Sequence, residues 1–543
     1  MKHLFWKGYN NNYKKNASKR LVLALRLFYC KTIFISQLTT KKMEKIKNCK
    51  MLLMTITVLL GFSTYATAQL TMSAQIRPRA EYRNGVGTLT PKDISGNGDT
   101  AAAGFISQRS RLSLNYKFEK LAFGMSIQDV RVWGQDASTI SNADGSRLSV
   151  HEAWAEALLI DSLGLSLKVG RQELLYDDSR LIGNLDWLQQ GRRHDAALLK
   201  LNNKGWQVDL GVAYNQTTDA FGVFNTFYTA GNTPQYITVK GSTVTIPAGF
   251  IPTATLGGAP VLTATPSTNG GNQMYKTMQY IYAAKKFGGM KLSGLLFKDD
   301  FGKYRLDSLT AGTEKVYGRR YDVKGVNSRI TAGLLAVGTA KKVFSYSVGA
   351  FIQSGKDRDG KDLSAYHFTV YGAYTKGKYT IGVGYDLLSG DALDTKTTES
   401  KRFDPLYGTP HKFWGLMDYF YAGTGSPVAG LSNPYLRLKY VASPKFTAGL
   451  DIHSFSLAQN AANKVVDATG KTLLGKHLGT ETDLILNYTL SKNIGFEAGY
   501  CMMFANDNLE VVKRNTMGKA NQTATWAYLS INFKPELISP PKK

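Results

Sequence analysis

The sequence lacks the features of a disulfide-stabilised protein or a helical membrane protein. Its 543 residues include three cysteines, too few for a disulfide framework. Between residues 69 and 543 there is no apolar run of about 20 residues, the length a transmembrane helix needs. Proline is scarce (15 residues), whereas glycine (53), tyrosine (30) and phenylalanine (25) are abundant. This aromatic content argues against a disordered chain.

Acidic residues are few relative to basic ones. The chain has 67 Lys and Arg against 40 Asp and Glu, a formal net charge of +27. Such a surplus can indicate nucleic-acid binding. Here, however, 13 of the basic residues lie within the first 50 positions, and many later ones alternate with apolar residues instead of clustering. We therefore expect no nucleic-acid partner.

The N-terminal region predicts export. A basic stretch leads into uncharged apolar residues 51–62, followed by the small residues Ala66 and Ala68. This order is typical of a secretory signal peptide, which we place at residues 43–68 with cleavage after Ala68. Residues 1–42 are then an upstream extension outside the mature protein. A membrane anchor at residues 21–38 is the alternative, but Arg26 and Lys31 inside it disfavour that interpretation.

Removing residues 1–68 changes the composition of what remains. The leader holds 13 basic residues and one acidic residue, which leaves +15 on residues 69–543. Cys30 and Cys49 are removed with it, so Cys501 is the only thiol left. The mature chain is therefore expected to have no internal disulfide and no cysteine-based zinc site. We expect no cofactor.

Two-residue alternation is the strongest pattern in the mature chain. Apolar and polar side chains alternate in many segments, among them residues 70–83, 109–118, 206–215, 344–353, 379–387, 484–490, 494–502 and 527–533. Alternation predicts strands with one apolar and one polar face. A soluble β-sandwich would also alternate, but the polar faces here are strongly charged and aromatic residues often end the segments.

The connections between these segments alternate between very short and long. Short ones are rich in Lys, Gly, Ser and Asn, whereas residues 216–276 form a long polar connection. These features favour an all-β, antiparallel transmembrane barrel of about 16 to 18 strands, with short periplasmic turns and long extracellular loops. Residues 69–533 would form the barrel and residues 534–543 a polar tail. Because no segment precedes the first strand, a plug domain is not expected.

Strand parity places a row of basic side chains inside the barrel. The residues expected to line the pore are Arg77, Arg79, Arg83, Arg109, Arg111, Arg171, Arg437 and Lys439. Guanidinium rows in a narrow channel attract carboxylates and sulfates. Alternatively, these cations pair with inward acids such as Glu81 and Asp386 and stabilise the wall. Both interpretations stay open.

A dense polar stretch follows Arg171. Arg180, Asp186, Arg192, Arg193 and Asp195 are candidates for a loop that folds inward and narrows the pore. They could equally form an ion-pair cluster that stabilises a turn. In a second polar stretch, His411 is a further pore candidate, although a lone histidine is more often a satisfied polar residue.

The order of several motifs resembles the alginate-export family of outer-membrane barrels. The motifs are Gly170-Arg171-Gln172, Arg180 to Gly183, Trp187, Gln190 to Arg192, Asp195-Ala196, Gly384 to Asp386, Ser389 to Asp391, His411 to Gly415 with Asp418, and Gly479 to Asp483. The resemblance implies a monomer of roughly 18 strands with an arginine-rich constriction that passes an acidic polysaccharide. It also implies the lipid bilayer and lipopolysaccharide of the cell outer membrane as surroundings.

These observations predict an outer-membrane porin or export channel for anionic or polar solutes, saccharide-like in character. One alternative is an outer-membrane barrel enzyme, which would need a nucleophile, a histidine and an acid converging on one face. The scattered histidines do not suggest such a site. The other alternative is a structural or adhesive barrel without transport.

Overall fold

The computed structural model describes residues 69–92, 102–134, 148–216, 235–256, 258–261, 275–392, 398–422, 427–460 and 475–539. The chain divides into two units, residues 1–68 and residues 69–543. The extension predicted at residues 1–42 and the signal peptide predicted at residues 43–68 lie outside the described residues. Every described residue belongs to the second unit.

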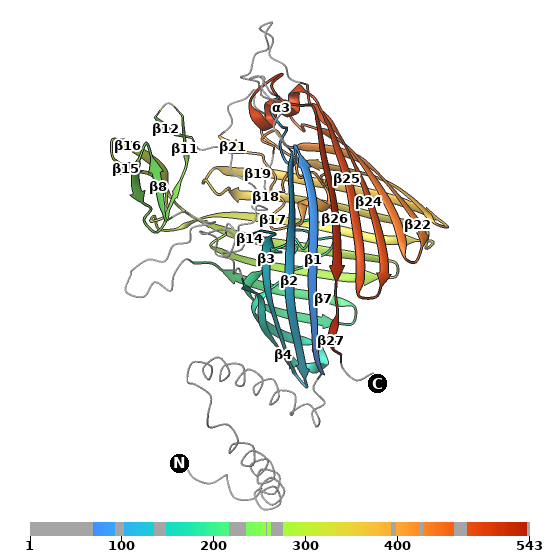
Figure 1. Cartoon of the computed structure of the whole chain (residues 1–543). Coiled ribbons are helices and arrows are strands. Elements are labelled where there is room, and N and C mark those ends of the chain that lie inside the picture. Colours follow the sequence, from blue (N-terminus) through green and yellow to red (C-terminus); the bar gives the residue numbers. More distant parts are fainter. Residues whose placement is uncertain are drawn as a thin grey trace, which may run out of the picture. The chain divides into compact units, whose positions relative to one another are not determined.

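Eighteen long strands form one closed antiparallel sheet (Figure 1). They are β1 (Gln69–Asn84), β2 (Ala103–Phe118), β3 (Leu121–Val132), β4 (Ser149–Ile160), β5 (Leu165–Gln172), β6 (His194–Asn203), β7 (Trp206–Tyr214), β13 (Thr277–Phe287), β14 (Met290–Gly302), β17 (Val326–Ala340), β18 (Phe344–Lys356), β19 (Asp362–Lys376), β20 (Tyr379–Leu388), β22 (Leu431–Ser443), β23 (Phe446–Ser456), β24 (His477–Ser491), β25 (Ile494–Ala505) and β26 (Thr523–Phe533).

Each strand pairs with its neighbours in this order, and the first strand closes the sheet against the last. β1 pairs with β2 on one side and with β26 on the other, from Ile76 opposite Phe533 to Asn84 opposite Thr525. Figure 1 shows the blue β1 and the red β26 side by side. Closure leaves no unpaired edge in the wall, as a barrel in hydrocarbon requires. The predicted barrel of about 18 strands is confirmed.

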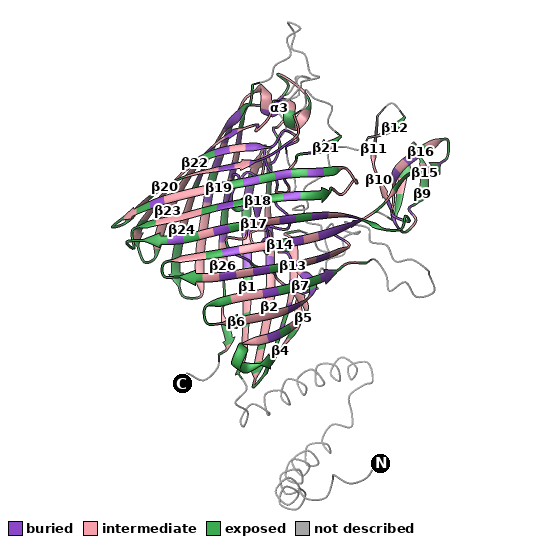
Figure 2. Cartoon of the chain, turned by 180° about the vertical axis from the view of Figure 1, so that it is seen from behind, coloured by how far each residue is buried: buried purple, intermediate pink, exposed green. Residues whose placement is uncertain are grey.

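Side chains alternate between the two faces of the wall as the sequence pattern predicts. On β1, Ile76 and Tyr82 are each 47% exposed on the outer face, while Arg77, Arg79 and Glu81 between them are buried on the inner face. Figure 2 shows the same alternation of buried and exposed residues along single strands. An apolar outer face and a polar inner face are what a membrane barrel requires.

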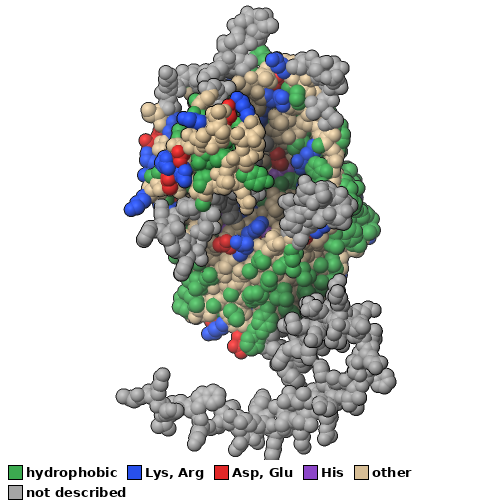
Figure 3. Space-filling view, turned by 60° about the vertical axis from the view of Figure 1, so that its left-hand side comes forward, with side chains coloured by type: hydrophobic (Ala, Val, Ile, Leu, Met, Phe, Trp, Pro, Cys, Tyr) green, Lys and Arg blue, Asp and Glu red, His purple; other side chains and the backbone are tan. Residues whose placement is uncertain are grey.

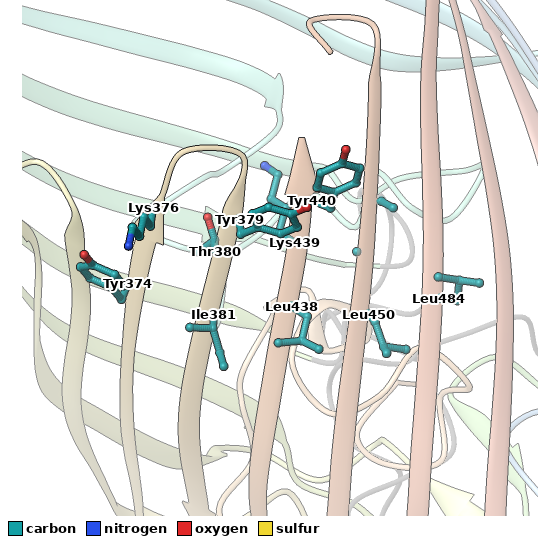
Figure 4. A pocket seen from close by; sticks show the side chains of 12 residues that line it. Tyr374, Lys376, Tyr379, Thr380, Ile381, Leu438, Lys439, Tyr440, Leu450 and Leu484 are labelled. Atoms are coloured by element: carbon teal, nitrogen blue, oxygen red, sulfur yellow. The ribbon is translucent and has the colours of Figure 1, made fainter. Parts of the chain in front are cut away.

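The outer face near the short turns carries an apolar groove (Figure 4). Tyr379 and Tyr440 lie at its end nearest the turns, and Ile381, Leu438 and Leu450 lie further along β20, β22 and β23. Tyr379 and Tyr440 stack with their ring centroids 4.9 Å apart. Tyrosines at this level match an aromatic girdle, where the ring contacts lipid and the hydroxyl reaches water.

Several inward aromatic rings lie flat over a glycine of the neighbouring strand. Tyr435 covers Gly384, where an added Cβ would lie 2.2 Å from the ring, and Tyr528 covers Gly499, where it would lie 2.0 Å away. Both pairs are cross-strand partners. Glycine is needed at these positions because the ring occupies the space of a side chain. The rings therefore follow the wall instead of projecting into the lumen.

The connections differ at the two ends of the barrel, as expected. The turn between β2 and β3 is two residues long, and one short turn contains η1 (Asp161–Leu163). At the other end the loops carry small sheets and the helix α3 (Asp507–Arg514). The short strands there are β8 (Tyr236–Val239), β9 (Ser242–Thr245), β10 (Phe250–Pro252), β11 (Ala254–Leu256), β12 (Ala259–Val261), β15 (Arg305–Ala311) and β16 (Glu314–Arg320). Among the described residues, no helix has the length and apolarity to cross a membrane.

The expected polar tail is partly a strand. Within residues 534–543, β27 (Glu536–Ile538) pairs with Met72 and Ser73 of β1. It continues the line of β26 beyond Phe533, so β1 keeps a partner toward its N-terminal end.

Candidate functional site

Two long loops fold into the lumen and pair with each other. The first luminal loop, residues 173–193, joins β5 to β6. The second, residues 389–430, joins β20 to β22 and contains β21 (Glu399–Ser400) and η2 (Pro410–Lys412). Ile182 and Tyr407 form a parallel bridge, in which the N–H of Tyr407 donates to the carbonyl of Leu181 at 2.9 Å. The N–H of Thr409 donates to the carbonyl of Ser179 at 2.8 Å.

The paired loops share one apolar core with inward side chains of the barrel wall, among them Phe297 and Trp526. The second luminal loop contributes fully buried aromatic side chains to this core, and the first loop contributes Leu181 and Ile182. The aromatic residues are Phe403, Tyr407, Trp414, Tyr419, Phe420 and Tyr421. Burying this much aromatic surface stabilises the loops as packed structure. The bore is therefore narrowed by a folded insert.

Arginines of β1 and β2 hold the first luminal loop. Arg77 and Arg109 both reach the carboxylate of Asp186, at 3.3 and 2.8 Å. Arg77 also donates to the side-chain oxygen of Gln189 at 3.1 Å. Arg111 lies 3.6 Å from Glu173 at the start of the loop. Burial opposes ionisation of Asp186, but Arg109 and Arg77 outweigh it and hold the pKa of that carboxyl below its usual range.

Trp187 links this arginine wall to the second luminal loop. The Arg79 guanidinium lies 3.7 Å from the Trp187 ring centroid, and His411 stacks with that ring at 4.2 Å. The ring nitrogen Nδ1 of His411 is hydrogen-bonded to Asp418 at 2.7 Å. Both faces of the indole are therefore occupied by protein groups. His411 contributes to packing between the loops.

Buried ion pairs fasten the loops to the opposite wall. Arg180 of the first loop donates to Asp386 of β20 at 2.9 Å. Arg329 of β17 contacts Asp299 of β14 at 2.6 Å and Asp404 of the second loop at 2.9 Å. Removing one partner would leave a charge without compensation in a site shielded from water.

Arg192 joins the end of the first loop to the second loop. Its guanidinium donates to the carbonyl of Gly408 at 2.8 Å. Burial lowers the pKa of Arg192 to about 10, so the side chain still carries its charge at neutral pH.

Two buried carboxyl groups of β24 hold a tight turn of the second loop. The N–H of Met417 donates to Glu481 at 2.8 Å, and the N–H of Leu416 donates to Asp483 at 3.2 Å. The turn depends on Gly415, which has φ +83° and lies against the Glu481 carboxylate. The second loop is thus fixed from two sides of the barrel.

The structure brings most of the predicted site residues together. Those gathered around the luminal loops are Arg77, Arg79, Arg109, Arg111, Arg180, Asp186, Arg192 and His411. Each of these side chains contacts a luminal loop or a group of the wall. The two interpretations offered by the sequence, an inward-folded loop and an ion-pair network, therefore both hold. Arg83 lies further along β1, where it pairs with Glu81 at 2.7 Å.

Two other predicted residues lie on a separate part of the inner wall. Arg437 forms an ion pair with Asp451 at 3.0 Å and donates to the carbonyl of Lys412 at 3.1 Å. Lys439 follows it on the same face of β22 and is exposed.

The expected pore position of Arg171 and Asp195 is wrong. Arg171 shares its face of β5 with Leu167 and Val169, which are exposed on the outer wall, whereas Gln172 is buried. Asp195 is exposed beside the buried His194 and pairs with Arg171 on the same outer face. Arg193 lies between the buried Arg192 and His194 and is only half-buried, which gives it the same outward phase as Asp195. The prediction gave Arg171 luminal parity, although Leu167 and Val169 set the opposite phase, and it expected Asp195 in an inward-folded loop, whereas Asp195 belongs to β6.

Sequence reasoning missed Arg329, Asp299 and Asp404. Arg329 and Asp299 occupy inward positions of alternating strands, so charge at luminal parity was a signal that could have found them. Asp404 had no such signal because it belongs to a loop. Among the described residues, no group of three or more His, Cys, Asp or Glu side chains could hold a metal ion.

A closed barrel with an apolar outer wall, a charged inner wall and two loops folded into its bore defines an outer-membrane channel for polar solutes. The family model for alginate export matches residues 68–219 and 257–522. This chain belongs to the alginate export family. No curated protein sequence matches it significantly.

Proteins of two bacteria are among the solved structures that this chain is similar to. OccK8 (OprE) of Pseudomonas aeruginosa is 14% identical with a TM-score of 0.47, covering 86% of this chain and 98% of that one. OpdO of the same organism is 13% identical with a TM-score of 0.49, covering 87% and 98%. OccAB4 of Acinetobacter baumannii is 12% identical with a TM-score of 0.48, covering 86% and 98%.

Proposed function

We propose that this channel is a passive, monomeric pore of the cell outer membrane that conducts saccharide-like solutes, acidic ones included, along the arginines of β1 and β2. The family's name supports an acidic polysaccharide as cargo. No chemical step is part of the proposal, since His411 is engaged by Asp418 and Trp187.

The observation that carries this proposal is the environment of Asp186. Its carboxylate lies between Arg77 and Arg109 and is 46% exposed, so a carboxylate is held at this point of the lumen while still facing solvent. Asp186 belongs to a loop, not to the wall. A uronate carboxylate reaching the same guanidiniums would find the geometry that Asp186 already uses.

The strands next to β26, which itself pairs with β1, carry acidic groups. Asp451 on β23, Glu481 and Asp483 on β24 and Glu497 on β25 all occupy inward positions. The acidic and the basic strands are neighbouring stretches of the wall on either side of β26, so carboxylates on a solute are repelled by the first stretch and attracted by the second. We therefore propose that neutral sugars pass as well, and that acidic groups on a sugar turn toward β1 and β2.

Flux measurements in proteoliposomes test this function. Neutral and uronate oligosaccharides of equal length are compared for the wild type, Arg111→Gln and Asp186→Asn. We expect Arg111→Gln to lower uronate flux severalfold relative to neutral flux, and Asp186→Asn to raise it. Arg305→Gln, which changes an exposed side chain of β15, serves as the control. Equal uronate-to-neutral ratios in all four proteins would refute the role of the arginine wall.

A further inference from the structure

Charged residues project from the outer wall at the ends of β5 and β6. Arg171 binds Asp195 through two hydrogen bonds of 2.8 Å, from Nε to Oδ1 and from Nη2 to Oδ2. The two side chains are 39% and 52% exposed. This ion pair is open to the surroundings of the barrel and takes no part in lining the pore.

Arg193 adds a second guanidinium to this pair. It lies on the outward phase between the buried Arg192 and His194, and among the described residues no hydrogen bond or ion pair is found for it. The cluster therefore holds two cations and one carboxylate, and the carboxylate is paired with Arg171. The cluster carries a positive surplus and has unused N–H donors, the two properties that anion binding requires.

The position of the cluster on the wall suggests what the anion is attached to. Leu167 and Val169 precede Arg171 on the same outer face and are exposed. Two strands away, the exposed Tyr214 ends β7, just beyond the Ala196–Ala213 pair. Exposed apolar residues followed by an aromatic side chain and then by charge mark the boundary between hydrocarbon and headgroups. In the view of Figure 3, hydrophobic side chains likewise cover the lower wall, and charged ones gather mostly above it.

We propose that Arg171 and Arg193 form a binding site for a phosphate of an outer-leaflet glycolipid, namely the phosphorylated glucosamine headgroup of lipopolysaccharide. Guanidinium groups bind phosphate bidentately, and Arg does so better than Lys because of its planar fork. The acyl chains of the same lipid would lie along the exposed Leu167 and Val169. Asp195 then competes with the phosphate for Arg171.

This arrangement makes the role of Asp195 diagnostic. If the cluster only stabilised the ends of β5 and β6, Asp195→Asn would remove a useful ion pair. If the cluster binds phosphate, the same substitution frees Arg171 and strengthens binding. A purely structural role predicts that Asp195→Asn lowers stability without strengthening lipid binding, whereas a phosphate-binding role predicts that it strengthens lipid binding.

The test is lipid binding to the detergent-solubilised mature barrel, measured by native mass spectrometry. Diphosphorylated lipid A is compared with the same lipid after dephosphorylation. For the phosphorylated form we expect about tenfold weaker binding to Arg193→Gln and to Arg171→Gln, and severalfold tighter binding to Asp195→Asn. The dephosphorylated lipid should bind all of them weakly and alike. Arg305→Gln is the matched control, since Arg305 is an exposed, paired arginine of β15.

Single-channel conductance, which depends on the lumen, should stay at the wild-type value in all variants and thereby shows that each has folded. Equal binding of both lipids to the wild type would overturn the proposal, because recognition would then rest on acyl chains alone. Unchanged affinity in Arg193→Gln would overturn it as well. Displacement of the lipid by millimolar inorganic phosphate would show a site for free anions and contradict the assignment to a glycolipid.

Discussion

At the scale of single residues, Arg329 connects the wall of the barrel to the loops in its bore. It joins β17 to Asp299 of β14 and to Asp404 of the second luminal loop. Asp299 also accepts a hydrogen bond from the Tyr407 hydroxyl at 2.8 Å. One guanidinium thereby connects two strands to the insert in the bore.

Replacing Arg329 should be costly. Arg329→Met leaves the Asp299 carboxylate buried without its counter-charge, and the loss of one partner of a buried pair costs about 3–5 kcal/mol. We expect the free energy of unfolding to fall by about 3 kcal/mol in urea titrations followed by tryptophan fluorescence. Arg305→Met, at an exposed ion pair, should change it by less than about 1 kcal/mol. Similar losses in both variants would contradict the importance of burial.

Lys513 of α3, at the extracellular end, makes a pH-dependent contribution to the free energy of unfolding. Its ammonium group donates to the carbonyl of Tyr419 and lies 5.3 Å from the Phe420 ring centroid. Burial lowers the pKa of Lys513 to about 7. In the unfolded chain a lysine titrates near 10.4, so between about pH 7 and 10 the unfolded state binds more protons and stability rises with pH.

Lys513→Met should therefore stabilise the barrel most at low pH. Below pH 7 the wild type keeps a charge in a partly desolvated place, and the variant does not. We expect the gain in free energy of unfolding to be largest at pH 6 and to shrink toward pH 10. Lys492→Met, at an exposed lysine, is the control and should show no such trend. A gain that is independent of pH would contradict the lowered pKa.

At the scale of elements, the strands were predictable and the luminal loops only in part. A lipid-facing wall enforces a period of two, so alternation located strands such as β7 and β25 and assigned their faces. Arg171 shows where this reasoning failed: Leu165, Leu167 and Val169 precede it in the outward phase, and the period was the better guide. Near the headgroups an outward charge costs little, so polarity does not determine the face there.

The loop pairing could not be derived from the sequence. Tyr407 meets Leu181 across more than 200 positions, and neither segment has a repeating pattern that indicates its partner. An inward-folded loop around Arg180 and Arg192 was one of two interpretations. The contacts that distinguish them depend on how the barrel brings distant strands together.

Gly415 is a position in the second luminal loop where a single methyl group should disturb the turn. It has φ +83°, and an added Cβ would lie 2.6 Å from the Glu481 carboxylate. Gly205 has φ +80° with open space around it. Gly205→Ala should therefore lower the free energy of unfolding by roughly 1 kcal/mol, the cost of placing alanine at a positive φ. Gly415→Ala should lower it by about 2 kcal/mol more, because the added methyl group also displaces the turn.

Limited proteolysis measures that displacement. We expect cleavage in the second luminal loop, at or near residues 411–420, to become faster in Gly415→Ala and to stay at the wild-type rate in Gly205→Ala. Equal cleavage rates would show that the turn does not depend on contact with Glu481.

At the scale of the whole molecule, the barrel holds itself together without covalent cross-links. Cys501 is fully buried and free, and it is the only cysteine among residues 69–543. Closure between β1 and β26 and the packing of the insert take the place of disulfides.

This makes Cys501 a reporter of global unfolding. In the mature barrel we expect a thiol reagent such as DTNB to react only when denaturant unfolds the chain, with a midpoint equal to that from fluorescence. Reducing agents should leave the midpoint unchanged. Reaction under native conditions would indicate that β24 and β25 open locally.

The pairing of the two luminal loops separates the diameter of the passage from the diameter of the shell. Eighteen strands set the circumference of the wall, but Ile182, Tyr407 and their neighbours determine how much of that circumference is open. Loop length and composition can therefore diverge between homologues while every strand register is retained. Among homologues, the size of the solute that passes could then change through substitutions, insertions and deletions in these two loops alone. Membrane insertion and barrel assembly would not be affected.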